Sequence, residues 1–234
     1  MVYTSEYPYF YVTVDIVALT IHDGVLCALV VERGAEPFKG RWALPGGFVN
    51  PDEGLLSAAE RELEEETDVS TGDVHLEQLA SFGAPGRDRR HRVVSVAHLA
   101  VLPHAPVPKA GSDAAGVAWK RVDELLQRRD VLAFDHFDIL TVGVERARTK
   151  LEYSALATEF VADEFTVAEL RRVYEVMWGR PLDPGNFHRK VTRNTDFVER
   201  VGRSVTRGPG RPAELFRFGG AEVLHPPLSR STFG

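Results

Sequence analysis

The chain has 234 residues, of which 44% are hydrophobic, 26% are charged and one is cysteine. This length predicts one medium domain together with a small one, and the hydrophobic fraction is sufficient for a buried core. A single cysteine, Cys27, excludes an internal disulfide, and no apolar run approaches the roughly 20 residues that a membrane helix needs. We find no signal peptide and therefore expect a cytoplasmic protein.

The net charge of −6 is unevenly distributed along the chain. Residues 180–217 carry nine basic and four acidic residues, although the chain as a whole is acidic. An acidic region joined to a locally basic one suggests two separate tasks, one of which involves phosphate groups.

The first two thirds of the chain predict many strands and few helices. Runs rich in Val, Ile and Leu, bounded by turn residues, predict strands, and a charged periodic stretch predicts a long connecting helix. The mixture is an α+β pattern. The expected strands span residues 12–19, 26–32, 74–82, 93–102 and 117–121, and the expected helices span 122–129 and 139–156.

The last third predicts two helices followed by a hairpin. Thr166 with Glu169 three residues later forms a capping-box pattern, so a helix begins there and continues to Trp178. Asp183 followed by Pro184 predicts the start of a second helix. A glycine-rich turn between two short strands completes the outline of a winged helix-turn-helix. We expect a first domain at residues 1–155, a winged-helix domain at 156–226 and a tail at 227–234.

An acidic stripe marks the centre of the first domain. Between Glu60 and Glu66 there are five carboxylates, and Glu62, Glu65 and Glu66 share one helical face. On another face, Leu56, Ala59 and Leu63 are expected to pack inward. Such a run is ordinarily a solvated helix surface. Here it follows a tight Pro-Gly-Gly turn, and three like charges on one stripe favour a bound cation such as Mg²⁺.

This segment resembles the Nudix box. Gly47 and Glu53 match the spaced glycine and glutamate, and the block from Arg61 to Glu66 matches the family's charged core; Asp68 stands where the family has glycine. The resemblance implies a Nudix α/β/α sandwich that handles a pyrophosphate through Mg²⁺ or Mn²⁺. It also implies that the metal ligands are Glu62, Glu65 and Glu66, with Arg61 as a further catalytic residue that can pair with Glu65 and with Glu53. Whether the box hydrolyses a ligand or only binds it stays open.

A second group of residues is expected to bind the ligand of this domain. The loop from Arg87 to Arg92 is either a solvated basic loop or a diphosphate contact, since arginine forks suit phosphates. It resembles the arginine loop of ADP-ribose-handling Nudix proteins. We expect His136 to be a structural partner of Asp135 rather than a catalytic base. The expected ligand-binding residues are Arg41, Gly46, Gly47, Arg87, Arg89, Arg92, Phe134 and His136.

The second helix of the winged-helix region is the expected recognition helix. Arginine reads guanine and asparagine reads adenine in the major groove, whereas hairpin arginines lie near phosphates. The alternative is a small helical domain that dimerises without touching DNA. The expected DNA-binding residues are Asn186, His188, Arg189, Lys190, Thr192, Arg193, Arg207 and Arg211.

The pairing of both regions resembles the Nudix-related transcriptional regulators, the NrtR family. The supporting motifs are Tyr174-Glu175, Asn186-Phe187, Arg189-Lys190 and the Gly-Arg-Pro-Ala stretch from 210 to 213. The resemblance implies a homodimeric repressor of NAD-biosynthesis genes that binds operator DNA and senses ADP-ribose or a related nucleotide. The alternative hypothesis is an active Mg²⁺-dependent ADP-ribose pyrophosphatase with a C-terminal oligomerisation module, because all the box glutamates are retained.

Overall fold

The computed structural model describes residues 6–69, 74–108, 114–206 and 212–233. They form two compact units. The first comprises the chain up to Leu19, Ala28–Ala100 and Pro106–Gly143, and the second comprises Thr20–Cys27, Val101–Ala105 and the chain from Val144 onward. Among the described residues, no helix combines the length and the apolar character needed to cross a bilayer.

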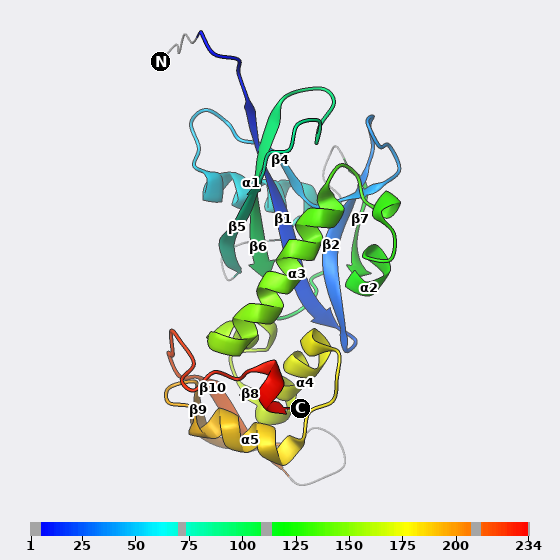
Figure 1. The fold of residues 1–234 in the computed structure, drawn as a ribbon. Coiled ribbons are helices and arrows are strands. Elements are labelled where there is room, and N and C mark those ends of the chain that lie inside the picture. Colours follow the sequence, from blue (N-terminus) through cyan, green and yellow to red (C-terminus); the bar gives the residue numbers. More distant parts are fainter. Residues whose placement is uncertain (1–5, 70–73, 109–113, 207–211, 234) are drawn as a thin grey trace. The chain divides into compact units, whose positions relative to one another are not determined.

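The first unit is centred on a mixed sheet of seven strands (Figure 1). Its main path has the order β3-β2-β1-β6-β5, while β4 pairs with β1 and β7 pairs with β2. Residues 14–20 of β1 are all buried, so this strand lacks the alternation of a half-exposed strand. The strands are β1 (Tyr11–His22), β2 (Val25–Arg33), β3 (Trp42–Ala43), β4 (Gly46–Phe48), β5 (His75–Phe82), β6 (Val93–Val101) and β7 (Ala114–Arg121).

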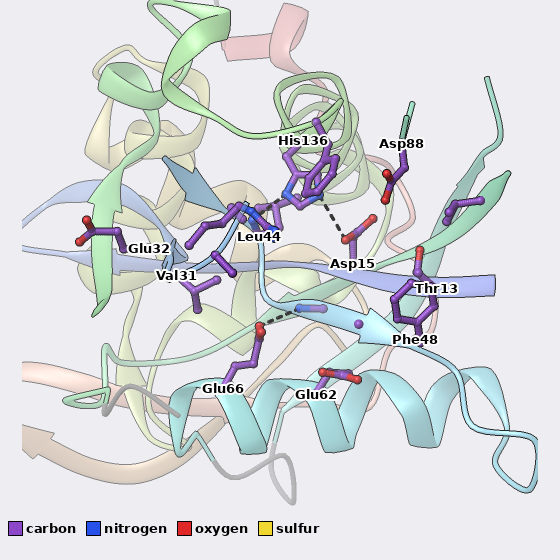
Figure 2. A pocket seen from close by; sticks show the side chains of 18 of the residues that line it. Thr13, Asp15, Val31, Glu32, Leu44, Phe48, Glu62, Glu66, Asp88 and His136 are labelled. Carbon is purple, nitrogen blue, oxygen red and sulfur yellow. Dashed lines mark hydrogen bonds and ion pairs between the residues drawn. The ribbon is translucent and has the colours of Figure 1, made fainter. Parts of the chain in front are cut away.

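Helices cover both faces of this sheet, as the sandwich prediction requires. Figure 2 shows α1 (Leu55–Thr67) and α3 (His136–Tyr153) on opposite sides of β1. Gly143 lets α3 approach β1 closely, because a Cβ there would lie 2.7 Å from a methyl carbon of Val17. The short helices α2 (Val122–Leu125) and η1 (Arg129–Val131) lead into α3, so the helix expected at 122–129 is shorter than predicted.

The inward face of α1 differs in one position from the prediction. Ala59 and Leu63 are fully buried, as expected. Leu56 is instead 48% exposed, because it lies outside the buried face of the helix, which consists of Ala58, Ala59, Leu63 and Thr67. The helix ends at Asp68, which adopts the left-handed conformation with φ 56°.

The second unit contains the winged-helix elements. Thr166 and Glu169 form the expected capping box at the start of α4, and the side chain of Asp183 caps α5, which begins at Pro184. A three-stranded sheet has the order β8-β10-β9. The elements are η2 (Ala155–Phe160), β8 (Phe165–Thr166), α4 (Val167–Trp178), α5 (Pro184–Arg193), β9 (Val198–Val205), β10 (Ala213–Phe218) and η3 (Arg230–Phe233).

Candidate functional site

A cavity of about 870 Å³ opens in the first unit beside α1, β1 and β4. Figure 2 shows Glu62 and Glu66 rising from α1 on one side, with Asp15 and His136 on the other. Three arginines, Arg33, Arg87 and Arg90, also line the cavity, together with Glu32 and Asp88. One space therefore joins an acidic end to a basic end, which suits a ligand that carries both phosphates and a bound cation.

The glycines of β4 form the floor of this cavity. Gly46 and Gly47 pair with Asp15 and Val14 of β1. A Cβ on Gly46 would lie 2.2 Å from the carbonyl oxygen of Val14, and one on Gly47 would lie 2.4 Å from Oε1 of Glu62. A side chain at Gly46 would push β4 away from β1, so this position requires glycine. A side chain at Gly47 would displace the carboxylate of Glu62.

Arg61 holds the box glutamates together. Its Nη2 lies 2.6 Å from Oε1 of Glu53, and its Nη1 donates to Glu62 Oε1 at 2.8 Å and to Glu65 Oε2 at 3.0 Å. These contacts confirm the expected pairing of Arg61 with Glu65 and Glu53. Hydrogen bonds from Arg61 lower the pKa of Glu53 to about 2. Arg61 thus orients carboxylates rather than presenting a free charge to a ligand.

The three glutamates expected as metal ligands do not occupy equivalent positions. Glu66 accepts a hydrogen bond from the Gly46 amide at 3.0 Å, and burial raises its pKa to about 7. Burial also raises the pKa of Glu62. The Glu65 side chain is 61% exposed and contacts Arg61. Within the described part of the chain, no three His, Cys, Asp or Glu side chains are arranged to hold a metal ion. Of the three box glutamates, Glu62 and Glu66 line the cavity and Glu65 does not, so the three do not form a preformed cage.

His136 has a different partner from the one expected. Its Nδ1 accepts a hydrogen bond from the Leu44 amide at 2.9 Å, which places the proton on Nε2, 3.3 Å from Asp15 Oδ1. Burial lowers its pKa, so the ring is neutral. The prediction that His136 partners Asp135 was wrong. The carboxylate of Asp135 pairs with Arg87, and the ring of His136 contacts Asp15, which is distant in the sequence.

Arg87 is a buried structural cation. It contacts Asp135 Oδ1 at 2.7 Å and Asp15 Oδ2 at 3.1 Å, and its side chain is 6% exposed. Ser95 also donates to Asp15, so Asp15 joins β1, β6 and the arginine loop. Asp15 carries no motif signal, and sequence patterns could not have identified it.

Two further arginines flank Phe134 at the basic end. The guanidinium carbon of Arg33 lies 4.8 Å from the ring centroid and that of Arg90 lies 5.7 Å from it. Burial, followed by the charge of Arg90, lowers the pKa of Arg33. Arg90 is also held by Asp88 at 2.8 Å. Neither arginine was singled out from the sequence, although Arg90 lies in the loop that was.

The other predicted ligand-binding arginines lie elsewhere in the first unit. Arg41 stacks over Phe38, and Arg92 stacks over Phe10. Arg89 is exposed. None of these three arginines is among the residues that line the cavity. The other predicted ligand-binding residues do line it, namely Gly46, Gly47, Arg87, Phe134 and His136.

Helix α5 presents a polar face to solvent. Phe187 and Val191 are fully buried, as expected, whereas His188, Arg189 and Arg193 are exposed. The side chain of Asn186 accepts a hydrogen bond from Arg189 at 2.8 Å, and Thr192 donates to the His188 carbonyl. Lys190 is half-buried. The predicted hairpin contacts Arg207 and Arg211 lie outside the described residues.

Comparison with family models assigns both units. The NUDIX domain model matches residues 10–141, and the model of the NrtR DNA-binding winged helix domain matches residues 157–218. The ADPR responsive transcriptional repressor NtrR of Acinetobacter baylyi is 34% identical over 216 residues, covering 92% of this chain and 84% of that protein. The chain belongs to the NrtR family.

Solved structures of NrtR agree with this assignment. Shewanella oneidensis NrtR is 33% identical, with a TM-score of 0.79 over 93% of this chain and 99% of that one. The same protein has been crystallised with a 27mer DNA, at TM-score 0.77 and 31% identity over 93% of this chain and 99% of that one. Its NUDIX domain has been crystallised with ADP ribose, at TM-score 0.55 and 34% identity over 60% of this chain and 90% of that one.

A shorter match is to an enzyme of another organism. The ADP-ribose pyrophosphatase of Methanocaldococcus jannaschii is 36% identical over 112 residues, which cover 48% of this chain and 62% of that protein. Nudix domains as a family generally use divalent metal ions.

Proposed function

We propose that this NrtR family member is an ADP-ribose-responsive transcriptional repressor of NAD-biosynthesis genes. The main support is the similarity to a repressor that is named as ADPR responsive, which extends over 92% of this chain. The cavity of the first unit, with its arginines and carboxylates, agrees with such a ligand. ADP-ribose has a diphosphate and two ribose groups. The cavity offers arginines for the former and polar groups for the latter.

In this proposal the diphosphate lies between Arg33 and Arg90. Both guanidinium groups face the Phe134 ring, and their mutual repulsion is relieved when an anion binds between them. We expect Arg33→Met and Arg90→Met each to weaken ADP-ribose binding about tenfold, the effect of losing a charge-assisted hydrogen bond. Arg89→Met is the matched control, because Arg89 lies in the same loop as Arg90 but is not among the residues that line the cavity. Calorimetric titration measures all three.

A divalent cation fits the acidic end of the cavity. Glu62 and Glu66 would hold it, and phosphate oxygens of the ligand would complete its coordination, as is usual for Mg²⁺. The cation would supply charge neutralisation for the diphosphate. Because Glu62 and Glu66 would leave the rest of the coordination to phosphate oxygens of the ligand, we expect Mg²⁺ or Mn²⁺ to raise the melting temperature more with ADP-ribose present than alone. Equal shifts with and without ADP-ribose would contradict this arrangement.

The DNA contacts in this proposal come from the exposed face of α5. Arg189, Arg193 and Asn186 are placed to meet base edges or phosphates. We propose a homodimer, so that two such helices meet two operator half-sites. Ligand binding would favour a dimer geometry that no longer matches those half-sites. Domain limits of 1–155, 156–226 and 227–234 remain part of the proposal, as does a cytoplasmic location, which access to chromosomal DNA requires.

The test is a gel-shift on promoter fragments of NAD-biosynthesis genes, with and without ADP-ribose. The same samples are assayed for AMP release. We expect sequence-specific binding that ADP-ribose abolishes while the DNA and protein remain intact. Absence of binding at low salt would reject the proposal, because phosphate contacts are strongest there.

The second candidate function is Mg²⁺-dependent hydrolysis of ADP-ribose. The intact Arg61 clamp on Glu53, Glu62 and Glu65 favours it, as does the matched pyrophosphatase. Turnover abolished by Glu65→Gln or Glu66→Gln would support it. No release of AMP from any nucleoside diphosphate sugar would count against it. A repressor that also hydrolyses its effector slowly satisfies both sets of observations.

A further inference from the structure

Residues 224–233 form a C-terminal strap that lies along the second unit. The amide of Leu224 donates to the Tyr153 carbonyl at 2.8 Å, and the amide of Leu228 donates to the Glu152 carbonyl at 2.7 Å. Both leucines are buried. Arg230 adds an ion pair with the Glu152 side chain at 2.7 Å. The stretch expected from its sequence to be a tail is thus anchored to the end of α3.

The strap also fixes the C-terminal end of α5. Asn194, the C-cap residue of this helix, is buried. Its Nδ2 donates to the Pro226 carbonyl at 2.8 Å, and its Oδ1 accepts from the His225 amide at 3.2 Å. One side chain therefore satisfies two strap backbone groups, which ties the helix end to the strap.

A second contact lies further up the helix. The Phe233 ring centroid is 5.8 Å from that of Phe187 and 5.9 Å from that of Trp178. The ammonium of Lys190 lies 4.0 Å from the Phe233 centroid, a cation–π geometry. Tyr174 completes the aromatic cluster, at 5.2 Å from Phe187.

The helical register separates Lys190 from the exposed cations of α5. Residues 187, 190, 191 and 194 are spaced by three and four, so they share the face that packs on the domain and the strap. Arg189 and Arg193 are also four apart, and they are exposed on another face. Lys190 therefore belongs to the inner face, although the sequence placed it with the DNA contacts.

We propose that the C-terminal strap positions α5 for DNA recognition through Asn194 and Phe233, and that Lys190 contacts the strap instead of DNA phosphate. This inference rests on the proposed role of α5 in binding DNA. It adds an element outside the matched winged-helix region, which ends at residue 218. A helix held at two points presents its outer side chains in one orientation, which base-specific contacts require.

The test uses the full chain and a DNA duplex that the wild-type protein selects from a random-sequence pool. Dissociation constants for this duplex and for a scrambled one are measured by fluorescence anisotropy at several salt concentrations. We expect Phe233→Ala to weaken binding of the selected duplex about tenfold, the scale of a lost aromatic contact, and to change binding of the scrambled duplex little. Phe233→Trp keeps an aromatic ring at this position and should bind the selected duplex with the affinity of the wild-type protein. Val223→Ala is the control, because Val223 is exposed just before the strap.

Salt dependence tests Lys190 separately. Log K falls as log salt rises, and the loss of one phosphate contact reduces the magnitude of this slope by about 0.9. We expect that decrease for Arg189→Met and an unchanged slope for Lys190→Met. A slope for Lys190→Met that falls as far as that for Arg189→Met would overturn the assignment of Lys190.

The outcomes separate this inference from the proposed function. If the wild-type protein selects no duplex, the proposed function fails and the role of the strap in recognition fails with it. If the wild-type protein binds and Phe233→Ala binds equally well, the strap inference alone is overturned. Should Phe233→Ala melt below the assay temperature, Phe233→Leu is compared with Phe233→Trp, since both fill the space and only Trp supplies a ring over Lys190. Equal affinities of these two variants would also overturn it.

Discussion

The Nη2 atom of Arg61 lies 2.6 Å from Oε1 of Glu53, eight residues earlier in the chain. This ion pair joins the loop before α1 to the middle of that helix. Arg61 also contacts Glu62, and both of these residues line the cavity. Glu53 is not among the lining residues, yet through Arg61 it helps to set the position of the Glu62 carboxylate. Outer contacts of this kind orient metal ligands without touching the metal.

The first prediction concerns this outer contact. Glu53→Gln should lower Mg²⁺ affinity in the presence of ADP-ribose about tenfold, the lower end of the usual effect of losing such a partner. Glu64→Gln is the matched control, because Glu64 is an exposed acid on the same helix. Equal metal affinities for the two variants would show that the clamp has no role in binding.

The second prediction concerns the floor of the cavity. Gly46→Ala should destabilise the fold by about 2 kcal/mol, because the added methyl meets the Val14 carbonyl and β4 must move. Gly83→Ala is the control, since its Cβ would meet only a Val94 methyl carbon at 3.5 Å. Urea unfolding measures both. A Gly46→Ala protein as stable as Gly83→Ala would mean that β4 does not pack on β1 as described.

Local signals in the sequence predicted the parts of the site that lie close together along the chain. The pairing of Arg61 with Glu65 follows from one helical turn, and the caps at Thr166 and Asp183 follow from short patterns. The fold class followed from the same kind of evidence, combined with the family resemblance.

Contacts between distant segments could not be predicted in this way. Asp15 contacts Arg87 across 72 residues, and Phe134 contacts both Arg33, at the end of β2, and Arg90, in the arginine loop. A periodic sequence pattern cannot predict such contacts, because they depend on the tertiary packing of distant segments. The inner position of Lys190 is different: its spacing from Phe187 already indicated it, and the general preference of basic residues for DNA outweighed that signal.

The third prediction concerns the departure from the Nudix pattern at Asp68. This residue ends α1 at φ 56°, a conformation that costs a non-glycine residue energy. Asp68→Gly should therefore stabilise the protein by about 0.5–1 kcal/mol, and Asp68→Asn should change stability less, since asparagine tolerates this conformation but still carries a side chain. Thermal melting of the three proteins tests the order. A loss of stability in Asp68→Gly would show that the side chain contributes more than the backbone costs.

The fourth prediction concerns His98, which is buried in β6. Its Nδ1 lies 3.0 Å from the Val96 carbonyl oxygen, so Nδ1 carries a hydrogen and donates it there. Burial lowers its pKa below the ordinary value of 6.5. In the unfolded chain the ring takes up a proton as the pH falls through about 6.5, whereas in the folded chain it does so only at a lower pH. The contribution of His98 to stability is therefore complete above that pH and is lost as the pH falls below it.

Comparison with His98→Gln isolates this effect. Replacing the ring should reduce the slope of the unfolding free energy against pH, between about pH 6.5 and 5.5, by up to about 1.4 kcal/mol per pH unit, the value for one proton. Glu66 acts with the opposite sign in this range, because its pKa is raised to about 7 and the folded state there holds more protons than the unfolded one. Its contribution is common to both proteins and cancels in the difference. Urea titrations at four or more pH values measure the two slopes, and identical slopes would mean that His98 is protonated as readily in the folded chain as in the unfolded one.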